Sequence, residues 1–198
     1  MKFPKWIIPV AIIAVLALWG IFKYNGLVAM DQNVKSCWSQ VENQYQRRSD
    51  LIPNLVNVVK GYASHERETL EGVITARSQA TETTINANDM DEAALQRFQQ
   101  SQDALSSALS RLMVVVEKYP DLKANGQFHD LSSQLESTEN RIARARRDFN
   151  EAAKAYNTHR SQFPTVVVAG LAGFRERPYF AAQAGSDVAP TVDFSSGK

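Results

Sequence analysis

The sequence is poor in the residues that build disulfides and metal sites. Its 198 residues include one cysteine and three histidines. A lone cysteine forms no intramolecular disulfide, so neither a disulfide framework nor a multi-cysteine metal site is available. Cys37 is expected to be a small core residue beside Trp38.

Turn-forming residues are scarce through the middle of the chain, where Pro53 is the only proline between Gly20 and Tyr119. Ala, Leu, Gln, Glu, Arg and Ser dominate this region, and their usage favours helices over strands. The length is that of one domain with appendages. We therefore predict an all-α protein with a single helical body.

Neither sign of charge is in excess. The formal net charge is +1, and beyond the three lysines at positions 2, 5 and 23 the chain carries 19 basic and 21 acidic residues. Because nucleic-acid-binding domains display a basic patch or stripe, this near-neutral body predicts no nucleic-acid partner.

Catalytic motifs are also missing. His65-Glu66 begins like the helical zinc-protease motif, but the position that needs the second histidine holds Thr69. His129 and His159 stand alone on other segments. The chain contains no nucleophile elbow and no glycine-rich phosphate loop. We predict no catalytic, cofactor-binding or metal-binding residues, and a protein that is not an enzyme.

One long apolar run is present, from Trp6 to Phe22, and it carries no charge. With its flanking residues it is long enough, at the low end, to span a bilayer core, and aromatic residues mark its ends. Lys2 and Lys5 precede it, so residues 1–5 are predicted to be cytoplasmic and residues 6–23 to form a transmembrane helix. Because no small-x-small cleavage site follows, an uncleaved signal anchor is favoured over a cleaved signal peptide.

A long helical repeat opens the body. Its 3,4-spaced face comprises Leu27, Asp31, Val34, Trp38, Val41, Tyr45, Arg48, Ile52, Leu55, Val59, Tyr62, Glu66, Thr69, Val73, Ala76 and Ala80. Pro53 lies inside this repeat, and two interpretations stay open. In one, Asp50 caps a new helix with Pro53 in its first turn, and the chain forms a hairpin. In the other, one long helix bends at Pro53, which cannot donate to Ser49.

Two further helical repeats follow. A loop at Thr81 to Met90 precedes them, with Asp89 or Asp91 as the helix cap. The first repeat comprises Leu95, Phe98, Gln102, Leu105, Leu109, Leu112, Val116 and Tyr119, and stops at Pro120. After a turn at Asn125-Gly126, the second comprises Phe128, Leu131, Leu135, Thr138, Ile142, Ala145, Phe149, Ala152, Tyr156, His159 and Phe163, and ends at Pro164.

Narrow apolar seams pack best at shallow angles, which predicts an antiparallel up-and-down bundle over residues 24–164. It has four long helices if Pro53 marks a hairpin, and three if Pro53 only kinks the first.

Arg48 and Glu66 stand at positions that the seam would bury. An unpaired buried ion costs several kcal/mol, so each needs a partner or access to water. Structural ion pairs or a seam loosened near Pro53 are the simpler explanation, and a polar network that fixes helix register is the sharper hypothesis.

Arg141, Arg144, Arg146 and Arg147 form the densest basic run. A solvated, salt-bridged face is favoured there over a site for anionic lipid or a partner.

The segment Thr165 to Phe174 is apolar and glycine-spaced. Exposed beside a finished bundle, it would need another copy, a partner or the bundle itself to cover it. Residues 165–198 are therefore predicted to form an apolar contact segment and a tail that is disordered from Ala184.

Several stretches carry a family resemblance. They are YNGLV at 24–28, RRSDLIPNLVNVVKGYASHE at 47–66, EKYPDLKAN at 117–125, ENRIARARRDFN at 139–150, AYN at 155–157 and FP at 163–164. In this order they resemble the LemA family of bacterial membrane proteins. The resemblance implies a single N-terminal membrane helix and an extracytoplasmic up-and-down bundle, and it favours the hairpin at Asp50 to Pro53. It implies no enzymatic activity that can be carried onto these residues.

Together these observations predict a single-pass protein of the bacterial inner membrane, with a cytoplasmic N-terminus and the bundle in the periplasm or outside the cell. The predicted function is a non-enzymatic scaffold or adaptor that forms a homo-oligomer, with a membrane protein as candidate partner. One alternative is an accessory subunit of a membrane protease or envelope-stress system. Another is an enzyme of unrecognised type, with a polar pocket around Arg48, Glu66 and His159.

Overall fold

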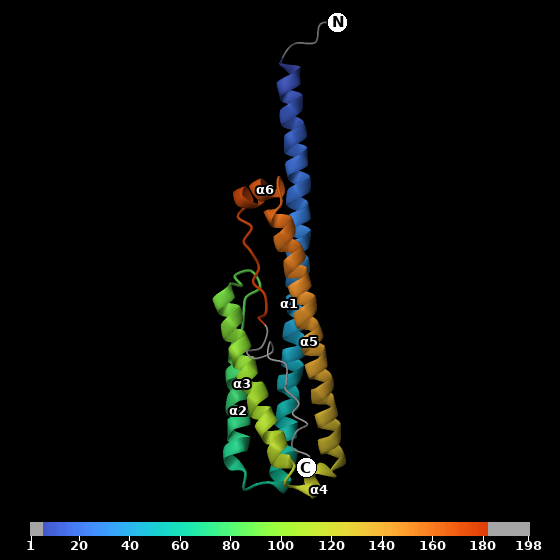
Figure 1. Cartoon of the computed structure of the whole chain (residues 1–198), viewed down its shortest axis with the longest axis vertical. Coiled ribbons are helices and arrows are strands. Elements are labelled where there is room, and N and C mark those ends of the chain that lie inside the picture. The colour runs from blue at the N-terminus through green and yellow to red at the C-terminus, as the bar shows by residue number, and fades with distance from the viewer. Residues whose placement is uncertain (1–5, 182–198) are drawn as a thin grey trace, which may run out of the picture.

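The computed structural model describes residues 6–181, and all regular secondary structure in this range is helical. The helices are α1 (Ile7–Tyr62), α2 (Arg67–Glu82), α3 (Glu92–Val116), α4 (Pro120–Lys123), α5 (Gly126–Ser161) and α6 (Thr165–Ala172) (Figure 1). The all-α prediction is confirmed.

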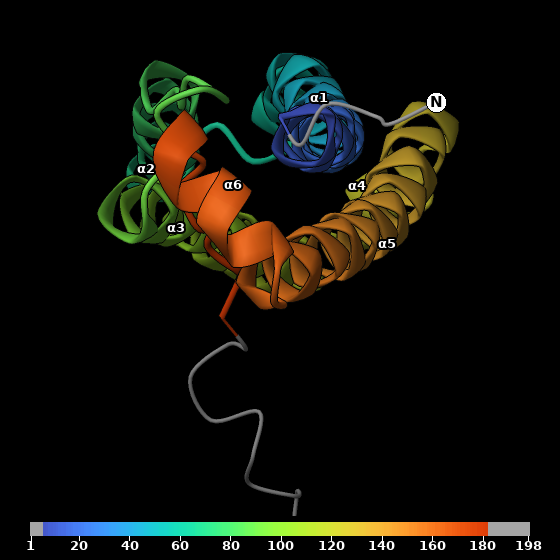
Figure 2. The same cartoon turned by 90° about the horizontal axis from the view of Figure 1, so that it is seen from above.

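The four long helices form an up-and-down bundle (Figure 1). Helices α1 and α5 run antiparallel along the whole body, while α2 and α3 form a second antiparallel pair beside its lower half. The short α4 closes the lower end, and α6 crosses the upper end (Figures 1 and 2). Above α6 the first part of α1 projects alone beyond the body.

Helix α1 is continuous for 56 residues, with Pro53 inside it. The hairpin that the family resemblance favoured at Asp50 to Pro53 is therefore wrong. The chain turns instead at Ala63–Glu66, where the sequence pattern predicted unbroken helix. Ala63 is buried in the core, and the buried stripe resumes at Leu70 in the next helix. The repeat counted from the sequence passes instead through Tyr62, Glu66 and Thr69, which keep the 3,4 spacing although none of them is buried, and this spacing concealed the turn.

Helix α1 tolerates Pro53 because another helix supplies the missing donor. Proline has no N–H, so the carbonyl of Ser49 one turn earlier loses its partner within the helix. Arg77 of α2 donates from Nε to this carbonyl over 2.8 Å. The hydroxyls of Ser49 and Thr81 lie 3.0 Å apart beside this contact. The carbonyl that Pro53 leaves unpaired in α1 is thus the acceptor of a hydrogen bond that joins α1 to α2.

Side-chain caps define two of the helix starts. The Asp91 carboxylate accepts from the backbone N–H of Ala94 over 2.6 Å, which confirms one of the two predicted caps of α3. Asn125, assigned from sequence to a turn, accepts from the N–H of Phe128 over 3.0 Å and caps α5.

The hydrophobic core has two parts. The upper core surrounds Trp38, whose ring contacts those of Phe98, Phe149 and Phe180 at centroid distances of 5.2, 5.7 and 6.0 Å. Cys37 packs against this cluster but is only partly buried. The lower core is aliphatic and includes Ile52, Leu55, Val59, Val73, Leu105, Leu112, Leu122 and Leu135.

An extended segment, Gly173–Ala181, leaves α6 and descends along the bundle; we call it the strap. It starts in a left-handed turn at Gly173, with φ of 74°, where the N–H groups of Gly173 and Phe174 return to the carbonyls of Gly170 and Ala169. Such a turn favours glycine because a side chain would be strained there.

The strap corrects the predicted boundary of the body at residue 164. Arg177 and Phe180 are buried, so the body continues to Ala181. Sequence patterns missed this because an extended segment held by residues three apart shows neither helical nor strand alternation. The predicted disorder from Ala184 lies outside the described residues.

We expect a double-mutant cycle to detect the link between Pro53 and Arg77. Arg77→Met should lower the free energy of unfolding by about 1.5 kcal/mol, because the Ser49 carbonyl loses a charged donor. In a Pro53→Ala background the new N–H can satisfy the same carbonyl, so Arg77→Met should cost clearly less. Urea unfolding of the four proteins measures this difference, with the exposed Arg67→Met as a control. Equal costs in both backgrounds would contradict the link.

Candidate functional site

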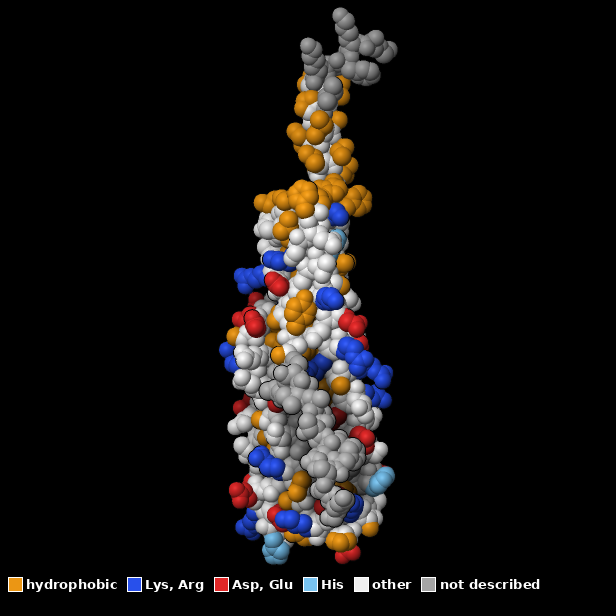
Figure 3. Space-filling model, in the orientation of Figure 1, with side chains coloured by type: hydrophobic (Ala, Val, Ile, Leu, Met, Phe, Trp, Pro, Cys, Tyr) orange, Lys and Arg blue, Asp and Glu red, His pale blue; other side chains and the backbone are white. Residues whose placement is uncertain are grey.

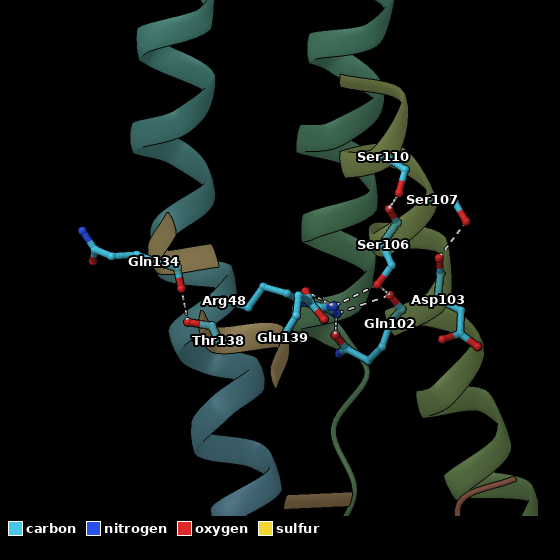
Figure 4. A network of polar contacts seen from close by, with 9 residues as sticks. All are labelled: Arg48, Gln102, Asp103, Ser106, Ser107, Ser110, Gln134, Thr138 and Glu139. Carbon is cyan, nitrogen blue, oxygen red and sulfur yellow. Dashed lines mark hydrogen bonds and ion pairs between the residues drawn. The ribbon is translucent and has the colours of Figure 1, made fainter. Parts of the chain in front are cut away.

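A buried arginine lies at the centre of the bundle. Arg48 of α1 is only 1% exposed. Its Nη1 donates to Ser106 Oγ and to Glu139 Oε1, each over 2.9 Å. Its Nη2 donates to Gln102 Oε1 over 2.6 Å and to the Gln102 carbonyl over 3.3 Å (Figure 4). The guanidinium also lies 5.0 Å from the centre of the Tyr45 ring.

The hydrogen bonds around Arg48 reach every long helix, directly or through Gln102. Gln102 and Ser106 belong to α3 and Glu139 belongs to α5 (Figure 4). The amide of Gln102 in turn donates to the carbonyl of Ala80, near the end of α2, over 3.1 Å. That carbonyl is one of the four that a helix leaves unpaired at its C-terminus. One set of hydrogen bonds, which we call the polar layer, therefore ties α1, α2, α3 and α5 together.

The polar layer separates the two parts of the core. Tyr45 lies in the upper core and Ile52 in the lower core, and Arg48 stands between them on α1. On α5 the buried Thr138 occupies the same level, between Leu135 and Ile142. The sequence carried the signal, since Gln102 and Thr138 are polar residues at seam positions, as Arg48 is. The hypothesis of a polar network holds for Arg48, but it had not named Gln102, Ser106 or Glu139 as its partners. The hydroxyl of Thr138 donates to the Gln134 carbonyl and not to this network.

Glu66 and His159 do not join Arg48. Glu66 lies in the turn after α1, half-exposed, and accepts from the Tyr119 hydroxyl over 3.1 Å. His159 lies near Gly26, where an added Cβ would be 3.8 Å from its Nε2. Gly26 and Arg48 are 22 residues apart on one helix, about 33 Å. The polar pocket hypothesised around these three residues is not formed.

A second polar cluster fastens the strap. Arg177 donates to Asp31 Oδ1 from Nε over 3.0 Å and from Nη2 over 2.5 Å. Lys35 reaches the other carboxylate oxygen of Asp31 over 2.8 Å. Arg177 Nη1 also donates to the carbonyl of Ala87, in the loop between α2 and α3, over 2.9 Å. This ion pair joins the strap to α1 and to that loop.

Asparagine side chains on α5 bind the strap backbone as a neighbouring strand would. Asn157 accepts from the N–H of Arg177 over 2.9 Å and donates to its carbonyl over 2.7 Å. Asn150 makes the same pair of bonds with Phe180, over 2.9 and 3.2 Å. The backbone groups of a buried extended segment need such partners, and α5 supplies them.

The basic run on α5 takes part in this attachment. Arg146 lies over the Phe180 ring, 4.7 Å from its centre, and donates to the carbonyl of Ala181 over 3.1 Å. Arg141, Arg144 and Arg147 are exposed, and none of the four forms an ion pair with a described carboxylate. The face is solvated, as predicted, but the expected salt bridges are not formed in the described part of the chain.

The chemistry of these clusters is structural. Burial alone would raise the pKa of Asp31, but the hydrogen bonds and positive charges of Lys35 and Arg177 outweigh it and hold this pKa below its ordinary value. A carboxylate held ionised by two cations acts as an ion-pair partner rather than as a general base. Over residues 6–181, no three His, Cys, Asp or Glu side chains are grouped to hold a metal ion.

The upper end of the body is apolar. Phe163 and Leu171 are 84% and 86% exposed, and Val166 and Val167 beside them are about half exposed. We call these four residues of and next to α6 the apolar cap. In Figure 3 hydrophobic side chains form a band at the top of the body and continue along the projecting part of α1. Thr165 and Ala169 are buried, so α6 packs on the bundle with one face and exposes the other.

The projecting part of α1 is long and apolar enough to cross a membrane, and only 6% of its most apolar stretch is buried inside the body. A core helix of a soluble protein would be mostly covered. The model of the LemA family matches residues 37–194. The chain belongs to the LemA family.

The curated relatives described here are each less than 30% identical to this chain. The chain is 28% identical over 196 residues to magnetosome protein MamQ 2 of Paramagnetospirillum magneticum AMB-1, covering 90% of this chain and 70% of the relative. It is 26% identical over 178 residues to magnetosome protein MamQ of Magnetospirillum gryphiswaldense MSR-1, covering 81% and 65%. It is 26% identical over 145 residues to protein LemA of Metamycoplasma hominis, covering 73% and 63%. The chain thus spans less than two thirds of the last two.

Family membership and the bare apolar segment of α1 together indicate a membrane-anchored protein. The family assignment adds no catalytic residue to the clusters described above.

We expect the two ends of the Arg48–Glu139 pair in this LemA family protein to respond unequally to removal. The Glu139 side chain is 45% exposed, so water can solvate it if Arg48 is lost. Arg48 has no such access, and Glu139→Leu should therefore cost about 3 kcal/mol of unfolding free energy. Arg48→Met should cost less, about 1 to 2 kcal/mol, mainly through the unpaired Gln102. Chemical unfolding of both variants measures this. The reverse order would contradict the asymmetry.

Acid should weaken the strap attachment through Asp31. Because its pKa is lower in the folded than in the unfolded protein, its contribution is complete above the unfolded pKa of about 3.9 and is lost as pH falls through the folded pKa. The stability difference between wild type and Asp31→Asn should thus shrink below about pH 4. Urea midpoints between pH 6 and 3 measure it, and Arg177→Met should reduce the same pH dependence. A constant difference across this range would refute the assignment.

Proposed function

We propose that this LemA family protein is a non-enzymatic scaffold, anchored in a bacterial membrane and self-assembling, with its body on the extracytoplasmic side. The observation that carries the proposal is the continuity of α1, which runs without interruption from the apolar segment into the core. The basic residues Lys2 and Lys5 ahead of that segment support the proposed orientation.

A continuous helix couples the membrane anchor mechanically to the body. A flexible linker would let the body move independently of its anchor, whereas an unbroken helix sets both its orientation and its height. The part of α1 within the body, Leu27 to Tyr62, has 36 residues and is about 54 Å long. Helix α5 packs along this part of α1, and the polar layer and the strap hold the other elements against the pair. These features support a rigid rod that stands on the membrane.

The interior charges also support a scaffold. Arg48, Asp31 and Arg177 are buried, and each is bound to partners on other elements. Arg48 is 1% exposed and its hydrogen bonds go to α3 and α5, while Arg177 of the strap is bonded to Asp31 of α1. Their shared property is that they connect helices, which is what a rigid structural element requires.

The mass of the full-length protein in mild detergent tests the proposal. We expect light scattering to give a discrete multiple of the monomer mass, because a scaffold must present its bodies in a fixed array, and electron microscopy of the same peak to show one regular shape. A monomer at all accessible concentrations would overturn self-assembly. Glu139→Leu offers a control, since a body with a weakened polar layer should give a less regular particle.

A further inference from the structure

We propose that α6 lies flat in the bilayer surface at which α1 leaves the membrane, so that the body has a second, interfacial contact with lipid. The proposal rests on the membrane anchor of the proposed function and adds a partner for the apolar cap. That partner is a phospholipid interface.

The height of α6 along α1 matches the end of the predicted membrane span. Helices α1 and α6 are in contact, and the rings of Tyr24 and Phe174 pack edge to face with centroids 5.6 Å apart. On α1, residues 9–18 are exposed and the first buried residue is Leu27. Helix α6 therefore crosses the body close to residue 23, where the span was predicted to end (Figure 1).

The orientation of α6 suits a surface position. Seen from above, α6 lies across the end of the bundle rather than along its axis (Figure 2). Its small residues Thr165 and Ala169 face the bundle, while the apolar cap is directed away from it. An exposed apolar helix face at the end of a soluble domain would favour aggregation. In the interface of a bilayer the same face is buried among the acyl chains.

Charged residues adjoin the cap where lipid headgroups would lie. Lys23 follows the apolar segment of α1, Arg160 lies in the last turn of α5, and Arg175 follows the turn at Gly173. Arg160 is held there by its bond to the Phe174 carbonyl, over 2.9 Å. These three basic residues outnumber Glu176, the acidic neighbour on the strap, and the resulting positive charge favours phosphate headgroups.

The length of the apolar span gives the second contact a physical use. Trp6 to Phe22 is 17 residues, about 25 Å of helix, whereas the hydrocarbon core of a bilayer is about 30 Å thick. A short span is accommodated by local thinning of the bilayer. An apolar cap beside the span buries additional apolar surface in the interface, and this offsets part of the free-energy cost of thinning the bilayer.

A second copy of the chain is the less suitable occupant. A stable interface buries about 800 Å² on each partner. The cap offers one aromatic side chain, which can bury about 150–250 Å², and three smaller aliphatic ones, of which Val166 and Val167 are already about half covered. The cap is also continuous with the apolar surface of α1 (Figure 3), so whatever covers the cap meets the bilayer as well.

Depth-dependent quenching in vesicles tests the proposal. The full-length protein with Cys37→Ala receives one cysteine, by Val167→Cys or Leu171→Cys, labelled with an environment-sensitive fluorophore. The proteins are reconstituted in phosphatidylcholine and phosphatidylglycerol vesicles, without nitroxide or with lipids that carry a nitroxide either near the headgroup or deep in the acyl chains. Val114→Cys, an apolar position of α3 that is 67% exposed, is the matched control on the body, and Ile13→Cys reports on the anchor. Deleting residues 165–198 is unsuitable, because it would remove Arg177 and Phe180 from the core.

We expect blue-shifted emission and strong quenching by shallow nitroxide at positions 167 and 171, and water-like, unquenched emission at 114. Water-like emission at 167 and 171 with a quenched label at 13 would overturn the lipid contact and leave the anchor intact. Blue-shifted labels at 167 and 171 that lipid nitroxides do not quench would mean that a protein surface covers the cap, which also overturns it. A water-like label at position 13 that neither the shallow nor the deep nitroxide quenches would overturn the anchor and this inference together.

Discussion

The bundle depends on how it accommodates one buried cation. Removing the Arg48 guanidinium from water is costly, and the cost is offset only if acceptors surround it with good geometry. Gln102, Ser106 and Glu139 provide them, and they do so only when α1, α3 and α5 stand in one register. A slide of one helix by a turn would leave the cation unpaired in an apolar seam. Apolar contacts alone distinguish such registers poorly, because leucine and valine at neighbouring turns are nearly equivalent. The polar layer thus favours one alignment of the helices.

The same register positions the membrane end. With α1 and α5 aligned at Glu139, the last turn of α5 comes level with the exit of α1 from the predicted span, and α6 crosses there. The chain then returns along the outside of the pair, where the asparagines of α5 receive it. The strap closes the upper half of the bundle, which α2 and α3 are too short to cover. Phe180 completes the aromatic cluster around Trp38 in the place that a fourth helix would otherwise fill.

Pro53 illustrates how far sequence patterns reach. The 3,4 spacing on both sides of it indicated one helix, and proline chemistry indicated a bend or an end; both are local facts. The outcome depended on Arg77, 24 positions away, whose donor replaces the missing N–H. The turn at Ala63–Glu66 was hidden for a related reason. Tyr62, Glu66 and Thr69 keep the 3,4 spacing across it although none of them is buried, because spacing alone does not report burial.

The sequence by itself determined the helical class, the apolar span, the seams of the three long repeats and the absence of recognisable catalytic motifs, because each follows from residue type and short-range periodicity. It also exposed Arg48 as a charge inside a seam. Only the tertiary structure decided which residues pair with Arg48, where α1 ends, and that Arg177 and Phe180 belong to the core. These contacts join residues between 54 and 146 positions apart, and no local pattern encodes which distant groups will meet.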